Sequence, residues 1–139
     1  MARVLIVDDE TDGAEAVCRF LRKGGHEAVH VPTGRDALAR LSTISPDVVV
    51  LDVMMPEMGG MEFLEVLRNY YRGQFIPVIL LTALADGHHI RRATHLGVKR
   101  IFLKSNYDLA DLLACVNELS TPISGAELSA ISAQASLNG

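Results

Sequence analysis

The segment VVVLD at residues 48–52 decides the fold. Four aliphatic residues follow one another without a polar interruption and end in an aspartate, and the segment VILLT at residues 78–82 repeats this design with a threonine at its end. Unbroken runs of Val, Ile and Leu are typical of parallel strands that are buried on both faces, whereas half-exposed strands alternate apolar and polar residues. The two segments therefore predict a parallel sheet that helices cover on both sides.

Three further apolar runs lie outside these two segments, and stretches with helical periodicity separate all five. The predicted strands are residues 3–7, 27–31, 48–51, 78–81 and 100–103. The run at 27–31 is the weakest, because Ala28 and His30 interrupt it, and it suits an edge strand. Five alternations of strand and helix imply right-handed crossover connections, and they predict a doubly wound α/β domain.

Five helices are predicted between and after these strands. Thr33, with Asp36 three residues later, has the spacing of a helix cap, and Ser105 and Asp108 are candidate caps for the last helix. The apolar faces expected of the helices are, in chain order, Ala14, Val17, Cys18 and Leu21; Ala37, Leu38 and Leu41; Met61, Leu64, Leu67 and Tyr71; Ile90, Ala93 and Leu96; and Leu109, Leu112, Leu113, Val116 and Leu119. The fourth helix, over 86–96, has the smallest apolar face and is expected to be the least securely anchored.

Length and composition limit the chain to one small acidic domain. It has 139 residues, of which 49% are apolar and 22% charged, and its net charge of −4 disfavours direct binding of nucleic acid. No apolar run approaches the roughly 20 residues that cross a bilayer. Two cysteines are too few for a disulfide framework, and the start of the chain lacks a signal-peptide pattern. The predicted location is the cytoplasm, with no membrane contact.

The composition changes after residue 119. Residues 120–139 hold five Ser, four Ala and a single charge, that of Glu127. Ser124 and Glu127 have the spacing of a capping box, so a short helix is one alternative, and a tail or interdomain linker is the other. The predicted organisation is one domain over 1–119 followed by this tail or linker.

Polar side chains end four of the five predicted strands. They are Asp8, Asp9 and Glu10 after the first strand, Asp52 after the third, Thr82 at the end of the fourth and Lys104 after the fifth. In a doubly wound sheet, ligands bind beyond the carboxyl ends of the strands, so these side chains are expected to meet in one site. Carboxylates packed together raise one another's pKa values, so such a site usually has a compensating cation. Mg²⁺ suits a site whose ligands are all oxygens.

Such a site supports phosphoryl transfer. A carboxylate can attack a phosphoryl group to give an acyl phosphate, and the transfer is catalysed mainly by position and by charge neutralisation. A metal ion, the Lys104 ammonium and the Thr82 hydroxyl would together surround the oxygens of the phosphoryl group.

Several short motifs occur in an order and spacing that are specific in combination. They are VDDE at residues 7–10, LDVMMPEMGG at residues 51–60, LTA at residues 81–83 and Lys104 after the fifth strand. On these motifs the chain resembles a response regulator receiver domain of two-component signalling, over residues 2–119. The resemblance implies a flavodoxin-like (βα)5 fold with strand order 2-1-3-4-5, and Pro56 and Gly60 match the family's loop and helix start.

The resemblance also implies roles for particular residues. Asp52 would be the phosphoacceptor, Lys104 would contact the phosphoryl group, and Thr82 would donate a hydrogen bond to it. The implied Mg²⁺ ligands are Asp8, Asp9, Asp52 and the backbone carbonyl of Met54, and the implied switch residues are Thr82, Ala83 and Ile101.

The partners and output also follow from the resemblance. The implied partner is a histidine kinase or a phosphotransfer protein. The fourth helix, the fifth strand and the fifth helix would form a docking or homodimer surface. The protein would be a signalling phosphoacceptor, not an enzyme, that assists its own phosphorylation and dephosphorylation.

The sequence departs from the family pattern at two positions. Ser105 stands where the family has a proline with a cis peptide bond, and Ile101 stands where it has Tyr or Phe, so output is expected to depend on the fourth helix. Phe102 is expected to face the other side of its strand. In addition, Met54 and Leu84 cannot orient an attacking water, which predicts a long-lived phospho-aspartate.

Two other functions are compatible with parts of the pattern. One is a receiver-like interaction module that does not switch, which Ser105 and Ile101 keep open. The other is a haloacid dehalogenase-like phosphatase, which also uses an Asp nucleophile with Mg²⁺. That family has Asp-x-Asp after its first strand, whereas this chain has the adjacent pair Asp8 and Asp9 there.

Overall fold

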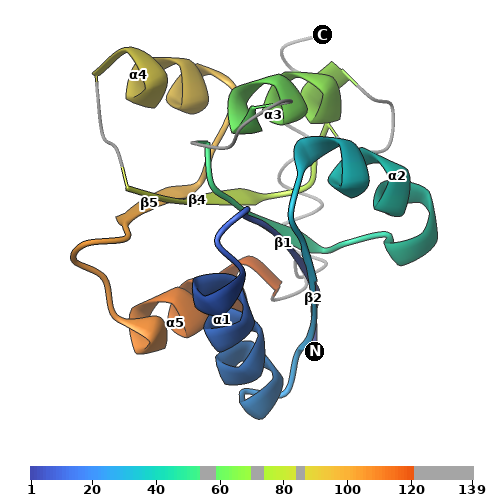
Figure 1. Cartoon of the computed structure of the whole chain (residues 1–139), viewed down its shortest axis with the longest axis vertical. Helices are drawn as coiled ribbons and strands as arrows, with labels where there is room; N and C mark the ends of the chain where they lie inside the picture. The colour runs from blue at the N-terminus through green and yellow to red at the C-terminus, as the bar shows by residue number, and fades with distance from the viewer. Residues whose placement is uncertain (54–58, 70–73, 84–86, 121–139) are drawn as a thin grey trace, which may run out of the picture.

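The structure is a computed structural model, and it describes residues 1–53, 59–69, 74–83 and 87–120. Within those residues, five strands alternate with five helices (Figure 1). The elements are β1 Arg3–Val7, α1 Thr11–Lys23, β2 Glu27–Val31, α2 Gly34–Ile44, β3 Val48–Leu51, α3 Gly60–Asn69, β4 Val78–Thr82, α4 Gly87–His95, β5 Arg100–Leu103 and α5 Leu109–Ser120. The predicted strands are confirmed, and β4 is one residue longer than predicted because Thr82 still pairs with Leu103. None of the described helices combines the length and the apolar character that a membrane span requires.

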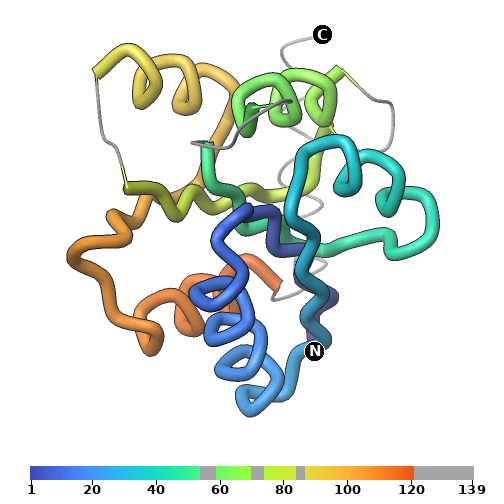
Figure 2. Tube along the Cα trace, in the orientation of Figure 1, coloured from blue at the N-terminus to red at the C-terminus, as the bar shows by residue number. Residues whose placement is uncertain are grey.

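The strands form one parallel sheet in the order β2-β1-β3-β4-β5, which confirms the predicted flavodoxin-like topology. Val7 of β1 lies opposite Val31 of β2 on one side and Leu51 of β3 on the other. The chain first moves from β1 outward to β2 and then returns past β1 to β3 (Figure 2). Ligands of doubly wound sheets bind at such a reversal of direction. The residues that follow Val7 and Leu51 therefore occupy the expected binding position.

Helices cover both faces of the sheet, with α1 and α5 on one face and α2, α3 and α4 on the other (Figure 1). Because alternate strand residues point to opposite faces, the buried side chains form two separate clusters. Val4 belongs to one cluster together with Cys18 of α1 and Cys115 of α5. Leu5, the next residue of β1, belongs to the other together with Phe63 of α3. Both cysteines are buried free thiols.

The buried face of α3 differs from the predicted one. Its fully buried residues are Gly60, Phe63, Leu64 and Leu67. Met61, which the sequence placed on that face, is only partly buried. The helix is rotated so that Phe63 points into the core, and an aromatic ring removes more apolar area from water than a methionine does. Tyr71, the last residue of the predicted face, lies outside the described residues.

The predicted cap signals correspond to real hydrogen bonds. At the start of α2, the Asp36 N–H donates to Thr33 Oγ1 at 3.0 Å. At the start of α5, the Ala110 N–H donates to Asp108 Oδ1 at 2.9 Å. Ser105 is exposed in the turn that precedes this helix, so Asp108 is the residue that caps α5.

The fourth helix has little buried surface. Ala93 is its fully buried residue, and Ile90 is partly buried. An ion pair between Arg92 and Glu65 joins it to α3. The small buried face agrees with the weak anchoring that the sequence predicts for this helix.

Candidate functional site

The carboxyl ends of β1, β3, β4 and β5 bring the predicted polar residues into one site. Asp8 and Asp52 are 4% exposed and Thr82 is 1% exposed, whereas Asp9 is open to solvent. One carboxylate oxygen from each of the three aspartates lies within 4.8 Å of the other two. The Asp52 N–H donates to the Val7 carbonyl at 2.9 Å, so the pairing of β1 with β3 continues up to the site. This register sets Asp52 beside Asp8.

Lys104 reaches into the site from the end of β5. Its Nζ lies 2.7 Å from Asp8 Oδ2, 3.0 Å from Asp52 Oδ2 and 3.3 Å from Glu10 Oε2. Its backbone N–H donates to the Thr82 carbonyl at 2.9 Å, which fixes where the side chain begins. Burial alone would lower the pKa of Lys104, but its hydrogen bonds with Asp8 and Asp52 and their charges outweigh burial and raise that pKa. The side chain is therefore an ammonium at neutral pH.

Asp8 is the carboxylate whose environment opposes ionisation. Burial raises its pKa, and the charge of Asp52 acts in the same direction. The hydrogen bond from Lys104 and the one from the Glu10 N–H, which donates to Asp8 Oδ1 at 2.9 Å, lower the pKa but do not cancel the effect of burial. The ionised site thus retains unfavourable free energy that additional positive charge would relieve.

The donor set of this site fits Mg²⁺. Asp8, Asp9 and Asp52 bring three carboxylates, and Lys104 is the ammonium in contact with two of them. Mg²⁺ prefers oxygen ligands and commonly takes one or two carboxylates, with water and phosphate oxygens at the other positions. The oxygen-only donors and the shortage of positive charge both match that preference. Met54, whose carbonyl completes the predicted ligand set, lies outside the described residues.

The two departures from the family pattern have clear positions in the structure. No cis peptide bond occurs among the described residues, so the bond between Lys104 and Ser105 is trans, and Lys104 still contacts the buried carboxylates. Ile101 is partly buried on the face that α3 and α4 cover. Phe102 is buried on the opposite face, as predicted, and Ala83 is exposed directly after β4.

Gly60 allows α3 to begin in contact with the loop that carries Asp52. A Cβ at this position would collide with the Asp52 carbonyl oxygen and lie 2.5 Å from Val53 Cα. Only glycine permits two backbone segments to approach this closely. Pro56, the other residue expected to shape this loop, lies outside the described residues.

Two residues at the site lie outside the sequence motifs that identified the others. His30 places its Nε2 atom 2.6 Å from the backbone oxygen of Asp8. Tyr107 lies in the segment between β5 and α5, and with Asp8 and Lys104 it lines a pocket of about 160 Å³ in which burial raises the pKa of its hydroxyl. Strand alternation could have indicated His30, because it shares the α1-facing side of β2 with the buried Ala28. No feature of the sequence points to Tyr107.

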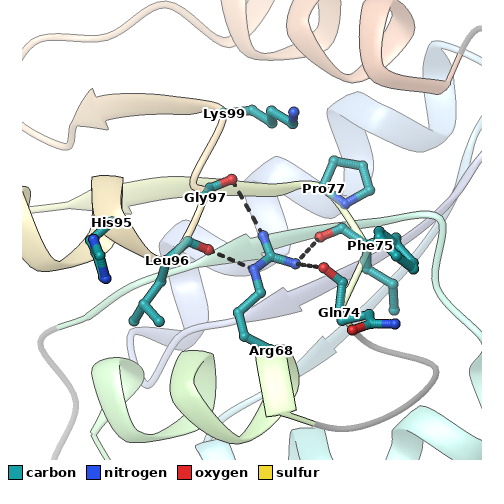
Figure 3. A pocket seen from close by; sticks show the side chains of 9 residues that line it. Arg68, Gln74, Phe75, Pro77, His95, Leu96, Gly97 and Lys99 are labelled. Atoms are coloured by element: carbon teal, nitrogen blue, oxygen red, sulfur yellow. Dashed lines mark hydrogen bonds between the residues drawn. The ribbon is translucent and has the colours of Figure 1, made fainter. Parts of the chain in front are cut away.

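A larger pocket, of about 400 Å³, lies at the opposite edge of the sheet, before β4 and β5 begin (Figure 3). The Arg68 guanidinium, near the end of α3, projects into it. This group donates to the carbonyls of Ile76 at 2.6 Å, Leu96 at 2.7 Å, Gln74 at 3.3 Å and Gly97 at 3.4 Å. These bonds tie α3 to the segments before β4 and after α4.

The sequence of the chain matches the family described as "Response regulator receiver domain" over residues 4–117. It is 36% identical over 131 residues to Response regulator MprA of Mycolicibacterium vanbaalenii, an alignment that covers 92% of this chain and 55% of that protein. It is 35% identical over 107 residues to Regulator of RpoS of Escherichia coli K12, covering 77% of this chain and 31% of that protein. The chain therefore spans only about a third to a half of the length of the curated relatives it matches.

Solved structures with the same fold include the chemotaxis protein CheY4 of Vibrio cholerae. The TM-score is 0.79 at 29% sequence identity, and the superposition covers 86% of this chain and 98% of CheY4. The match favours the receiver interpretation over a haloacid dehalogenase-like phosphatase. The family match, the strand order and the acidic site agree, and the chain belongs to the receiver domain family of two-component response regulators.

Proposed function

We propose that Asp52 accepts a phosphoryl group from a histidine kinase or a phosphotransfer protein in a Mg²⁺-dependent reaction. The placement of the Asp52 carboxylate supports this most directly. It is buried, it lies 3.0 Å from the Lys104 ammonium, and one of its oxygens is within 4.8 Å of oxygens of Asp8 and Asp9. Phosphoryl transfer to an aspartate needs a nucleophilic oxygen with positive charge around it, and this arrangement provides for both.

The side chains of the site have separate parts in the proposed reaction. An Asp52 oxygen attacks the phosphorus atom, the bond between phosphorus and the donor's leaving atom breaks, and an acyl phosphate forms. Lys104 is placed to pair with the oxygens of the incoming group, and Thr82, buried at the end of β4, is the candidate hydroxyl donor. Bound Mg²⁺ supplies positive charge to the same oxygens. The residues proposed to hold it are Asp8, Asp9, Asp52 and the backbone carbonyl of Met54.

We propose that the resulting conformational change begins at Thr82 and Ala83 and alters docking on the surface of α4, β5 and α5. Because Ile101 stands in the place of a reorienting aromatic, movement of α4 is the proposed carrier of the signal. The small buried face of α4, with Ala93 as its fully buried residue, supports this choice. The same surface is the proposed site of homodimerisation.

The proposed organisation is a receiver domain over 1–119 followed by a tail or linker over 120–139, most of which lies outside the described residues. A downstream protein or a fused output domain would receive the signal. The chain would act in the cytoplasm as a signalling phosphoacceptor that assists its own phosphorylation and dephosphorylation, without touching nucleic acid or membrane itself.

Labelling by acetyl phosphate tests the phosphoacceptor role. Wild-type protein is expected to gain one phosphoryl group when Mg²⁺ is present and none when EDTA replaces it, and Asp52→Asn is expected to remain unlabelled. An unlabelled wild type, or a variant that labels as well as wild type, would refute the role of Asp52.

A receiver-like module that does not switch is the second candidate, and Ser105 and Ile101 are the residues that favour it. Amide chemical shifts of α4 and β5, recorded before and after labelling, separate the two candidates. Shifts that spread to Ala93 and Ile101 are expected for a switching receiver, whereas shifts confined to the Asp52 loop are expected for the module.

A further inference from the structure

His30, on the edge strand β2, reaches the backbone beneath the acidic site. Its Nε2 atom lies 2.6 Å from the backbone oxygen of Asp8, and its side chain is only 9% exposed. A carbonyl oxygen can only accept a hydrogen bond, so Nε2 carries the proton and donates. On the other side of the ring, Nδ1 lies 3.7 Å from Oε1 of Glu15 on α1. The imidazole thus bridges the first helix and the end of the first strand.

The Asp8 carbonyl lies where the pairing between β1 and β2 ends. The last paired residues are Val7 and Val31, and the Asp8 N–H still donates to the Val31 carbonyl at 3.1 Å. Glu27 and Val31 exchange hydrogen bonds with β1, so the next N–H in register for the Asp8 carbonyl would be that of Thr33, which lies beyond the end of β2 at the cap of α2. A side chain, rather than the next rung of the ladder, therefore holds the Asp8 carbonyl in place.

The carbonyl that His30 holds belongs to the peptide unit that joins Asp8 to Asp9. The atoms of a peptide unit from one Cα to the next are coplanar, so the direction of this carbonyl constrains the orientation of both residues. The Glu10 N–H donates to Asp8 Oδ1 at 2.9 Å and so holds the side chain of Asp8 in the same loop. Asp8 and Asp9 provide two of the three carboxylate oxygens that lie within 4.8 Å of one another.

We propose that His30 is a positioning residue for the metal site, which fixes the peptide between Asp8 and Asp9 so that both carboxylates face Asp52. The proposal rests on the Mg²⁺-dependent function proposed above. Partners that orient ligands without touching the metal typically change metal affinity by about 10- to 100-fold when they are removed. His30 contacts the backbone of Asp8 and not a carboxylate that would bind the metal. We therefore expect a loss of Mg²⁺ affinity near the lower end of this range.

The chain offers a matched control in another histidine with little exposure to solvent. His26 is 8% exposed and makes two hydrogen bonds, accepting from the Ala2 N–H at 3.0 Å and lying 2.7 Å from Asn117 Oδ1. It comes directly before β2, at the amino-terminal edge of the sheet, whereas the acidic site is at the carboxyl edge. Loss of its hydrogen bonds affects stability without altering the loop that carries Asp8.

The test is a titration with MgCl₂ followed by amide chemical shifts, together with thermal unfolding in EDTA. His30→Phe keeps a ring but removes the donor, His30→Gln keeps a donor, and His26→Phe is the control. We expect His30→Phe to bind Mg²⁺ about 10-fold more weakly than wild type, His30→Gln to bind within about threefold, and His26→Phe to bind as wild type does even though it unfolds at a lower temperature. His30→Leu is a second variant without a donor if His30→Phe does not fold.

The proposal is overturned if the donorless variants bind Mg²⁺ as wild type does. Equal losses of affinity in His30→Phe and His26→Phe would overturn it too, because they would reflect general destabilisation. Failure of the proposed function gives a different result: wild-type protein itself would show no Mg²⁺ binding and no labelling at Asp52.

Discussion

Replacing Gly60 with alanine is expected to push the first turn of α3 away from the backbone of Asp52. The new Cβ would lie 2.5 Å from Val53 Cα, and it would be closer still to the Asp52 carbonyl oxygen. Ordinary contacts between carbon atoms are about 3.5 to 4.0 Å, so the helix and the loop must separate by about 1 Å. Overpacking of this kind costs about 1 to 3 kcal/mol, and the better helix propensity of alanine offsets at most about 1 kcal/mol. The net loss expected is about 1 to 2 kcal/mol.

Two measurements report this displacement. In a domain of this size, the expected loss of stability lowers the Tm by about 3 to 8 °C. Because the strain acts on the loop that carries Asp52, labelling by acetyl phosphate is also expected to slow by about 10- to 100-fold.

Gly13→Ala is the matched control, since it adds the same methyl group within α1. There the Cβ meets only the flexible Glu10 side chain, at 3.1 Å to Oε1. This variant should be as stable as wild type or up to about 1 kcal/mol more stable. If Gly60→Ala unfolds at the wild-type temperature and labels at the wild-type rate, the reasoning that α3 packs directly against the Asp52 backbone is refuted.

Three further predictions concern the charges and the lifetime of the site. Lys104→Met is expected to destabilise the metal-free domain by about 2 kcal/mol in urea unfolding. This is less than the loss for a fully buried ion pair, because the Lys104 side chain is 18% exposed. An unchanged unfolding midpoint would contradict the pairing of Lys104 with Asp8 and Asp52. Burial raises the pKa of Asp8, so the folded state binds its proton more readily than the unfolded chain does. The stability of the metal-free protein should gain a contribution as pH falls through that raised pKa toward the ordinary value of 3.8, and wild type and Asp8→Asn should differ in slope over this range. Phosphorylated Asp52 is expected to persist for minutes, because Met54 and Leu84 cannot orient an attacking water, and decay within seconds of removing a small phosphodonor would refute this.

The strands and the acidic site could be predicted because their signals are local. The run VVVL at residues 48–51 identifies a buried strand without reference to any other part of the chain. The meeting of Asp8, Asp52 and Lys104 then follows from the fold class, since parallel strands deliver the residues after them to one edge of the sheet. Neither inference requires knowing how a particular side chain is oriented.

The contacts that could not be predicted depend on register and rotation. His30 and Asp8 are 22 residues apart, and they meet because the pairing of β2 with β1 ends at Val31, which no periodicity encodes. The choice of Phe63 over Met61 for the core depends on how α3 rotates against the sheet, and both residues are apolar. The Lys104 side chain contacts Asp52 although the peptide bond between Lys104 and Ser105 is trans. This contact likewise depends on where β5 ends.

Contacts hold helix α3 in place at both of its ends. Gly60 seats its first turn on the backbone of Asp52, and Arg68 in its last turn binds the carbonyls of Ile76 and Leu96 at the far edge of the sheet. Its ten residues span about 15 Å at 1.5 Å per residue. Because α3 is attached at both ends, we expect a displacement of the Asp52 backbone to reach the segment before β4 and the segment that leaves α4.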